Sequence, residues 1–253
     1  MKILATKKDN NFGTLYKFEH LDEKPNGING KLFLKFDYSF NFDKMDTEIC
    51  LALSKTDLTK YPIVTGVMPP KLKYGKFENE VMWDFDGDRE IFNSLNWMEQ
   101  RKFLFFKHKS LLPWFFIVDL KPSKFKDRNR DNQPWNDFSN LVPYTKECLQ
   151  SLPFESIGRV CIYGSWPQAE VPCHRDWIPD GIFHHHINLN PGGYRPIYIY
   201  DSTKDYKYYL PKDYKLYAYQ TTDYHGVDAL PHFSYTIRVD GTFNKEISEE
   251  LNV

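Results

Sequence analysis

The sequence predicts a mainly β domain, built as a sandwich, barrel or jelly roll, with an α/β elaboration on its N-terminal side. The first observation is a series of short apolar runs in the second half, separated by turn residues. Closely spaced strands with turn signals are typical of these β architectures. The second observation is an aromatic content of 17%, with 20 Phe and 17 Tyr, because such rings suit half-buried strand surfaces. The runs are 158–163, 182–189, 196–200, 215–219 and 233–239.

The first hundred residues have a mixed pattern. Residues 31–42 alternate apolar and polar side chains and predict a strand, with residues 48–53 as its partner. Residues 61–75 are rich in proline and glycine and predict a loop. Residues 89–108 predict a helix, because apolar residues recur there near helical spacing.

Three further elements precede the β-rich half. Residues 111–120 are almost continuously apolar and predict a buried strand, and residues 122–137 are polar and predict a loop. Residues 139–152 predict a second helix. The residues expected along its buried side are Leu141, Tyr144, Cys148 and Leu149.

The length and apolar content fit one integrated domain. A chain of 253 residues that is 41% hydrophobic can bury a sizeable core. The pattern changes near residue 150. We therefore divide the chain into an α/β support region, 1–150, and a β-rich core that carries the chemistry, 151–253, without expecting two independently stable domains.

Charge and cysteine usage exclude several kinds of partner. A formal net charge of −1 and a pI near 6.7 argue against nucleic acid, and the basic run 121–130 is interpreted as a solvated loop. No stretch approaches the ~20 apolar residues of a membrane span, so no membrane association is expected. The four cysteines form no CxxC pair and the N-terminus lacks an apolar signal core, which together predict a reduced, cytoplasmic protein.

Four residues in the last third have the types and order of a metal site. His174 and Asp176 form a His-x-Asp step, and His225 follows the apolar run 215–219. Two histidines and one carboxylate form the facial triad that holds non-haem Fe(II) and leaves positions open for O₂ and a co-substrate. Arg238 follows in the next apolar run, where a forked guanidinium suits the binding of an organic acid.

In this order and context, the segment from about 159 to 243 resembles the double-stranded β-helix core of the Fe(II)/2-oxoglutarate-dependent oxygenases. The resemblance covers roughly the last third of the chain. It implies a jelly-roll fold in which His174, Asp176 and His225 bind Fe(II), and Arg238 holds the distal carboxylate of 2-oxoglutarate. It also implies that 2-oxoglutarate is decarboxylated to succinate while O₂ is used to hydroxylate a second substrate.

Further contacts to 2-oxoglutarate are expected from the strands of this core. In prolyl-hydroxylase-like members, a polar residue before a Leu-Asn step helps to bind the co-substrate, and here that residue is Asn188. His186 shares a strand face with it, as does His184, and Tyr163 and Thr236 on other strands are also expected to face the site. Alternation puts His185 on the opposite face, so the run 184–186 does not predict a second metal site. His232 is expected at the surface or behind the site.

Departures from the family patterns narrow the activity. Asn244 stands where the DNA-repair dealkylases of this superfamily carry a second arginine, and Asp240 stands where the small-molecule synthases carry a serine. Asp176 is the carboxylate that halogenases lack, so hydroxylation is expected. The best fit is a hydroxylase similar to the prolyl or aspartyl/asparaginyl type, with residues 177–180 near the substrate entrance.

The alternative is a cupin or jelly-roll protein, either a metal-dependent enzyme or a binding module, that does not use 2-oxoglutarate. Weaker 2-oxoglutarate binding with retained metal in Arg238→Ala would favour the oxygenase. The sequence leaves open whether the substrate is a protein side chain or an amino-acid-like small molecule, and it fixes neither the oligomeric state nor the source.

Overall fold

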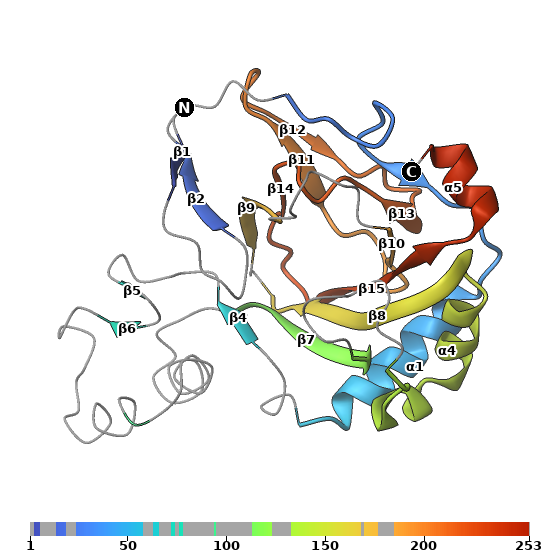
Figure 1. Ribbon diagram of the computed structural model, residues 1–253. Helices are drawn as coiled ribbons and strands as arrows, with labels where there is room; N and C mark the ends of the chain where they lie inside the picture. Colours follow the sequence, from blue (N-terminus) through green and yellow to red (C-terminus); the bar gives the residue numbers. More distant parts are fainter. Residues whose placement is uncertain are drawn as a thin grey trace.

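The structure, a computed structural model, is a mainly antiparallel β protein with few helices (Figure 1). It describes residues 3–5, 14–18, 24–57, 63–65, 72–73, 76–77, 94, 113–122, 133–167, 170–176 and 185–252. Within these ranges, no helix combines the length and the apolar character needed to cross a membrane.

The elements fall into an N-terminal set and a strand-rich C-terminal set. The first set is β1 (Ile3–Ala5), β2 (Thr14–Phe18), β3 (Leu34–Lys35), α1 (Phe42–Ser54), β4 (Ile63–Thr65), β5 (Leu72–Lys73), β6 (Lys76–Phe77), β7 (Pro113–Lys121), the 3-10 helix η4 (Asp137–Leu141) and α4 (Pro143–Gln150). The second set is β8 (Phe154–Ser165), β9 (Val171–Arg175), β10 (His186–Leu189), β11 (Ile197–Asp201), β12 (Tyr206–Tyr209), β13 (Leu216–Ala218), β14 (His225–Val227), β15 (Ser234–Phe243) and α5 (Lys245–Leu251).

The eight strands of the second set alternate between two sheets. One described sheet has the order β3-β13-β10-β15-β8-β7-β4, and the other has the order β1-β2-β9-β14-β11-β12. Along the chain, β8, β10, β13 and β15 therefore lie in the first sheet, and β9, β11, β12 and β14 lie in the second. This winding between two facing antiparallel sheets is a double-stranded β-helix, a form of jelly roll. The predicted fold is confirmed.

Strands from the first 150 residues extend both sheets. β7 pairs with β8 over most of its length, β3 adds to β13, and β2 adds to β9 with β1 outside it. The support region therefore contributes strands directly to the sheets of the core. The boundary near residue 150 stays a prediction.

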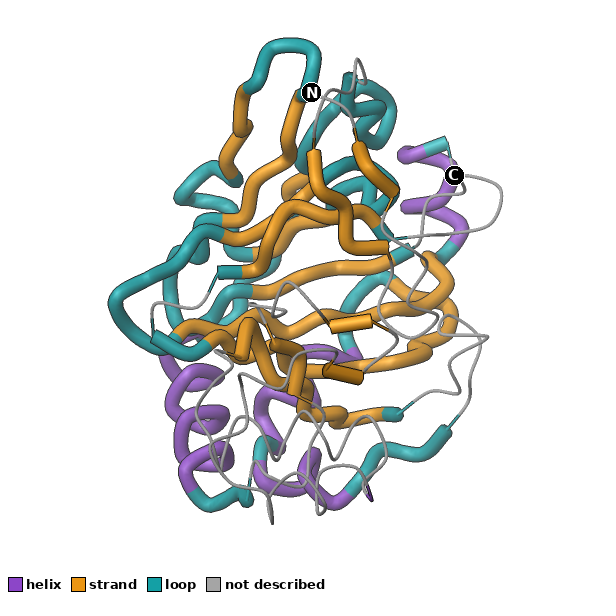
Figure 2. The backbone as a smooth tube through the Cα atoms, turned by 90° about the vertical axis from the view of Figure 1, so that its left-hand side faces the viewer, coloured by secondary structure: helices purple, strands orange, loops and turns teal. Residues whose placement is uncertain are grey.

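Helices α1 and α4 cover the outer face of the sheet that contains β8 and β15. Figures 1 and 2 show α1 and α4 beneath this sheet. Met45 and Ile49 of α1 and Leu149 of α4 pack with sheet residues such as Ile162 and Ile237 in one large cluster. The inner face of the same sheet is turned toward the other sheet, and a second cluster that includes Cys161, Tyr217 and Ile199 joins the two.

The prediction for residues 31–53 was wrong in two places. Only Leu34–Lys35 of the expected strand 31–42 form a strand, although Phe36, Tyr38 and Phe40 do pack against the outer cluster. Residues 48–53 belong to α1 and not to a partner strand. The Asn41 side chain accepts a hydrogen bond from the Lys44 N–H at 3.0 Å and caps the helix, which ends the alternating pattern.

Of the other elements predicted between residues 61 and 152, some are confirmed and some are wrong. The strand at 111–120 is confirmed as β7, and the helix at 139–152 corresponds to η4 and α4, although Leu141 is 51% exposed. The loop expected at 61–75 contains β4 and β5. Lys121 is buried and donates to the Ile157 carbonyl, contrary to the solvated loop expected for it. The helix expected at 89–108 lies outside the described residues, except for residue 94.

Candidate active site

Alternation along β15 places a row of polar side chains on the inner face. Thr236, Arg238 and Asp240 occupy every second position, so they share one face of the strand. Arg238 lies opposite Cys161 of the inter-sheet cluster, which identifies that face as the inner one. All three residues are buried. Buried polar groups on three successive inward positions mark this strand as part of a site and not as ordinary core.

Pairing with the neighbouring strands brings the predicted 2-oxoglutarate contacts onto the same face. Asn188 of β10 lies opposite Arg238, and His186 lies opposite Asp240. Tyr163 of β8 lies opposite Thr236. Directly opposed residues in an antiparallel pair project to the same side of the sheet. All four predicted contacts, Asn188, His186, Tyr163 and Thr236, are therefore on the inner face with Arg238.

The metal-ligand positions meet on the second sheet. β14 pairs with β9 so that His225 lies directly opposite His174. Asp176 follows β9, and its N–H donates to the Thr221 carbonyl at 2.9 Å. The side chain of His174 is outside the described residues, so the described part of the triad consists of Asp176 and His225. The register brings positions about fifty residues apart in sequence onto adjacent strands.

His225 is held in one orientation. Its ring is buried, and Nδ1 lies 2.9 Å from the Asp223 carbonyl oxygen. A carbonyl can only accept, so Nδ1 carries the proton. In the neutral ring, Nε2 is then the nitrogen with a free electron pair, as metal ligation requires.

Asp223 fixes the turn that precedes His225. Its carboxylate accepts from the Asn26 N–H at 2.9 Å and from the Gly27 N–H at 2.7 Å. These bonds tie the turn to a segment of the support region nearly two hundred residues away in sequence. The carbonyl that orients His225 therefore belongs to a turn that the N-terminal part of the chain holds in place.

Gly226 allows the close approach of the strands around His225. A Cβ at this position would lie 2.7 Å from the Val171 carbonyl oxygen of β9 and 2.6 Å from the Tyr198 ring of β11. The first neighbour is backbone and cannot move aside without shifting the strand. The glycine after the second histidine is therefore required by the packing of β14 between β9 and β11.

Arg238 is already paired with two carboxylates. Its Nε donates to Asp240 Oδ1 at 2.7 Å, and its Nη1 lies 3.8 Å from Asp176 Oδ2. Burial by itself lowers the pKa of Arg238, but Asp240 together with Tyr163 and Asp176 raises it above its usual value. The guanidinium therefore stays charged and lies beside the carboxylate predicted to bind metal.

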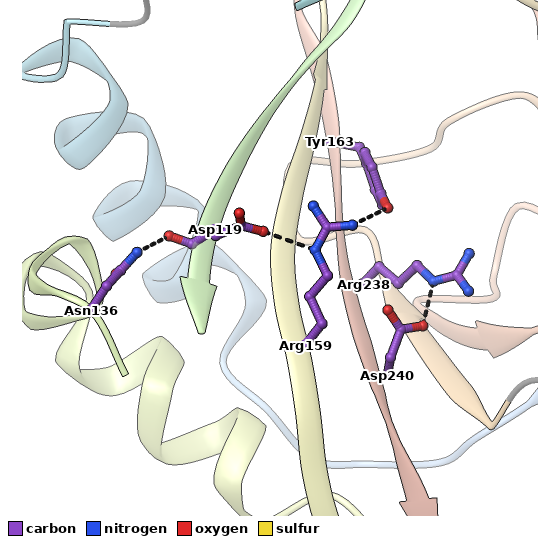
Figure 3. A network of polar contacts seen from close by, with 6 residues as sticks. All are labelled: Asp119, Asn136, Arg159, Tyr163, Arg238 and Asp240. Atoms are coloured by element: carbon purple, nitrogen blue, oxygen red, sulfur yellow. Dashed lines mark hydrogen bonds and ion pairs between the residues drawn. The ribbon is translucent and has the colours of Figure 1, made fainter. Parts of the chain in front are cut away.

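A second arginine on this face is also paired. Arg159 Nε donates to Asp119 Oδ1 at 2.9 Å, and its Nη1 reaches the Tyr163 hydroxyl at 3.5 Å. Figure 3 shows Arg159 and Arg238 side by side, each turned toward its own acid. Tyr163, predicted as a co-substrate contact, is thus held by a neighbouring arginine.

The third arginine, Arg195, precedes β11 and is 5% exposed. Its Nη1 donates to Thr236 Oγ1 at 3.1 Å, and its Nη2 donates to Ser165 Oγ. Thr236 in turn donates to Asn190 Oδ1 at 2.7 Å. Burial lowers the pKa of Arg195. Its hydrogen-bond partners are neutral hydroxyl groups.

Tyr219 connects these parts of the site. Its ring centre lies 5.0 Å from that of His225 and 5.4 Å from that of His186. Burial raises the pKa of its hydroxyl, while Arg238 acts in the opposite direction. The neutral ring forms an apolar wall between the second histidine of the predicted triad and the polar row of β10 and β15.

The remaining predictions fall as follows. His185 lies on the opposite face, as expected, and stacks on Phe243 at 4.8 Å. His232 is exposed. His184 and residues 177–180 lie outside the described residues.

Sequence reasoning missed Arg195, Tyr219 and the pairing role of Asp240. Period-two alternation from Arg238 was a signal for Asp240, and an arginine directly before an apolar strand was a signal for Arg195.

No protein-family model matches this chain, and no curated protein matches it. Among solved structures, the chain is similar to a prolyl hydroxylase from Trichoplax adhaerens in complex with a hypoxia inducible factor peptide fragment. The identity is 8%, 89% of each chain is covered and the TM-score is 0.44.

It is also similar to a viral collagen prolyl hydroxylase from Paramecium Bursaria Chlorella virus-1 in a 2OG complex, with 11% identity, 84% of this chain and 96% of that chain covered, and a TM-score of 0.38. A 2OG-Fe(II) oxygenase family oxidoreductase from Burkholderia pseudomallei matches at 8% identity, over 50% of this chain and 67% of that chain, with a TM-score of 0.35. These TM-scores are low, so the likenesses carry no weight for the reaction or the substrate, which have to be inferred from the side chains.

Proposed function

We propose that this protein is an Fe(II)/2-oxoglutarate-dependent dioxygenase that hydroxylates a protein side chain or an amino-acid-like small molecule. The observation that carries the proposal is the register of β9 and β14. It pairs His174 with His225, while Asp176 follows directly on β9 and lies beside Arg238 of the facing sheet. The residue types of the facial triad thus meet where two strands of a jelly roll adjoin the polar inner face.

The residues present fit Fe(II). Two imidazoles and one carboxylate are the donor set of non-haem Fe(II) oxygenases, and they leave positions for other ligands. The bond from His225 Nδ1 to the Asp223 carbonyl leaves Nε2 for the metal. His174, Asp176 and His225 would hold the ion. Bound Fe(II) would supply the one-electron chemistry that O₂ requires, coupled to decarboxylation of 2-oxoglutarate.

The inner face and the adjoining turn also fit a polar co-substrate. Several buried polar atoms have no hydrogen-bond partner among the described residues, and buried polar groups are ordinarily paired. They include the side-chain amide nitrogens of one residue in β10 and of the residue that directly follows this strand. Two oxygens of the turn next to Asp176 are also among them. These atoms are Asn188 Nδ2, Asn190 Nδ2, Gln220 Oε1 and Thr221 Oγ1. An acid with several oxygens would satisfy the donors among them.

The protein's own groups orient the ligands and exclude water. Asp223 fixes the turn before His225, and the Thr221 carbonyl fixes the backbone of Asp176. Tyr219 covers one side of His225 with an apolar ring. Pre-organised ligands and an apolar wall are what a site needs in order to confine O₂ chemistry to its substrate.

The proposal is tested by oxygen consumption and succinate formation in the purified protein. Wild-type protein should consume O₂ and release succinate only when Fe(II) and 2-oxoglutarate are both present, even before the second substrate is known. Asp176→Ala and His225→Ala should abolish both signals, whereas the surface variant Glu249→Gln should keep them. Equal signals in wild type and both triad variants would refute the proposal. Metal binding without any 2-oxoglutarate turnover would favour a cupin that does not use this co-substrate.

A further inference from the structure

The charges on the inner face do not balance. Arg159 and Arg238 each have a carboxylate at hydrogen-bond distance, Asp119 at 2.9 Å and Asp240 at 2.7 Å (Figure 3). Arg195 is paired with no carboxylate among the described residues. If Asp176 is taken up by a metal ion, it cannot compensate Arg195 either. Among the described residues, one buried positive charge on this face therefore has no compensating carboxylate.

Arg195 is buried and incompletely bonded. Two of its N–H groups bond to the hydroxyls of Ser165 and Thr236, and its Nε has no hydrogen-bond partner in the described part of the chain. A guanidinium carries five N–H donors, so three have no partner among the described residues and are available to a ligand. A buried charge that is neither paired nor fully bonded is costly, and such a group is retained where it receives an anion. The lowered pKa of Arg195, caused by burial, agrees with this state.

Arg195 belongs to the same site as the metal-binding positions. Its Nη1 donates to Thr236 Oγ1 at 3.1 Å, and Arg238 is the next inward side chain along β15. Arg238 Nη1 in turn lies 3.8 Å from Asp176 Oδ2. Arg195 therefore adjoins the polar row that leads to the proposed metal ligand. A short-chain diacid that chelates a metal at one end would extend in this direction.

We propose that Arg195, and not Arg238, receives the distal carboxylate of the 2-oxoacid co-substrate. Ser165 and Thr236 hold the guanidinium in place, and its free N–H groups face the carboxylate. Arg238 instead acts as a positioning residue, because Asp240 already neutralises it and its Nη1 lies 3.8 Å from Asp176. This inference rests on the proposed function, and it assigns the co-substrate specificity to a residue outside the His-x-Asp…His…Arg pattern.

The test compares two 2-oxoacids that differ only at the far end of the chain. 2-Oxoglutarate and 2-oxopentanoate share the metal-chelating end, but the second has a methyl group in place of the distal carboxylate. Calorimetric titration of the anaerobic, Fe(II)-loaded protein should show that wild type prefers 2-oxoglutarate by on the order of 100-fold, as expected for two charge-assisted hydrogen bonds. Arg195→Met should lose this preference while its affinity for 2-oxopentanoate stays the same. Arg195→Lys, which keeps the charge without the fork, should recover part of it.

The double variant Arg238→Met, Asp240→Leu is the matched control, because it removes a guanidinium from the same face together with the carboxylate that neutralises it, and it should keep the preference. Thermal unfolding gives a readout without turnover. Ligand-free Arg195→Met should unfold at or above the wild-type temperature, and 2-oxoglutarate should raise the unfolding temperature of wild type by more than that of Arg195→Met, whereas 2-oxopentanoate should raise both equally. An Arg195→Met variant that does not fold would overturn the inference, because Arg195 would then hold the fold together.

The outcomes separate this inference from the proposed function. If wild type prefers 2-oxoglutarate and Arg195→Met keeps that preference, only the role of Arg195 is wrong. The role of Arg195 is likewise wrong if the double variant Arg238→Met, Asp240→Leu abolishes the preference and Arg195→Met does not. If wild type binds neither 2-oxoacid, the proposed function fails and this inference fails with it.

Discussion

The buried pair between Arg238 and Asp240 leads to a large and specific prediction for Asp240→Asn. The two groups lie 2.7 Å apart, and their side chains are 6% and 0% exposed. At an effective dielectric constant of 20, opposite charges at this distance attract each other by about 6 kcal/mol before desolvation is counted. Removing one partner of a buried pair typically costs about 3–5 kcal/mol. For a chain of this length, that corresponds to a fall in Tm of roughly 6–20 °C.

Asparagine has nearly the shape of aspartate, so the loss reports charge and not packing. The measurement is thermal and urea unfolding followed by circular dichroism. Glu249→Gln is the control, because Lys245 and Glu249 are 3.6 Å apart but 87% and 69% exposed, and it should change nothing measurable. The double variant Arg238→Met, Asp240→Leu should be more stable than Asp240→Asn, since it removes both charges. A destabilisation by Asp240→Asn of less than about 1 kcal/mol would refute the reasoning, because the loss of one charge from a buried pair should reduce stability by more than that.

Three further predictions concern the strands of the site, an outer-face histidine and the metal. Gly226→Ala should destabilise the protein by about 1–3 kcal/mol and weaken Fe(II) binding, because the added Cβ would displace β14 from the Val171 carbonyl; unchanged iron affinity by equilibrium dialysis would contradict the packing. Burial lowers the pKa of His185 below 6.5, so its contribution to stability is present above about pH 6.5 and is lost as the pH falls below that value. His185→Gln should therefore flatten the dependence of unfolding free energy on pH between about 7 and 5, and an unchanged slope would count against the shift. Removal of Fe(II) with a chelator should lower the unfolding temperature of wild type but not of His225→Ala, since a ligand that binds only the native state stabilises it; equal shifts would place the metal elsewhere.

The positions of most core strands along the chain could be predicted, because these strands carry their own apolar pattern. β8, β11, β13 and β15 correspond to apolar runs that periodicity identifies directly. β9 and β14 contain only five and three residues, and they carry the two histidines that we propose as metal ligands. Their pairing is imposed by neighbouring strands, so no local pattern predicted them. The helix α1 was mistaken for a strand because the aromatic alternation before it obscured the cap at Asn41.

The candidate site, too, could be predicted only in part from the sequence. The order and chemistry of His174, Asp176, His225 and Arg238 could be noticed along the chain, and the structure brings these positions to adjoining strands of two facing sheets. The state of each arginine could not be predicted, because it depends on which carboxylate a neighbouring strand presents. Asp240 stands two residues from Arg238 and neutralises it. The partners of Arg195, more than forty residues earlier, are hydroxyl groups in the part of the chain that the structure describes.

Anaerobic addition of 2-oxoglutarate to the Fe(II)-loaded protein examines the site itself, before any second substrate is known. A bidentate 2-oxoacid on Fe(II) produces a weak visible charge-transfer band. We predict that this band appears in wild type, saturates at one equivalent of 2-oxoglutarate per bound iron, and is absent in Asp176→Ala and His225→Ala. A folded, iron-loaded wild-type protein without the band would contradict the assignment of an Fe(II)/2-oxoglutarate site.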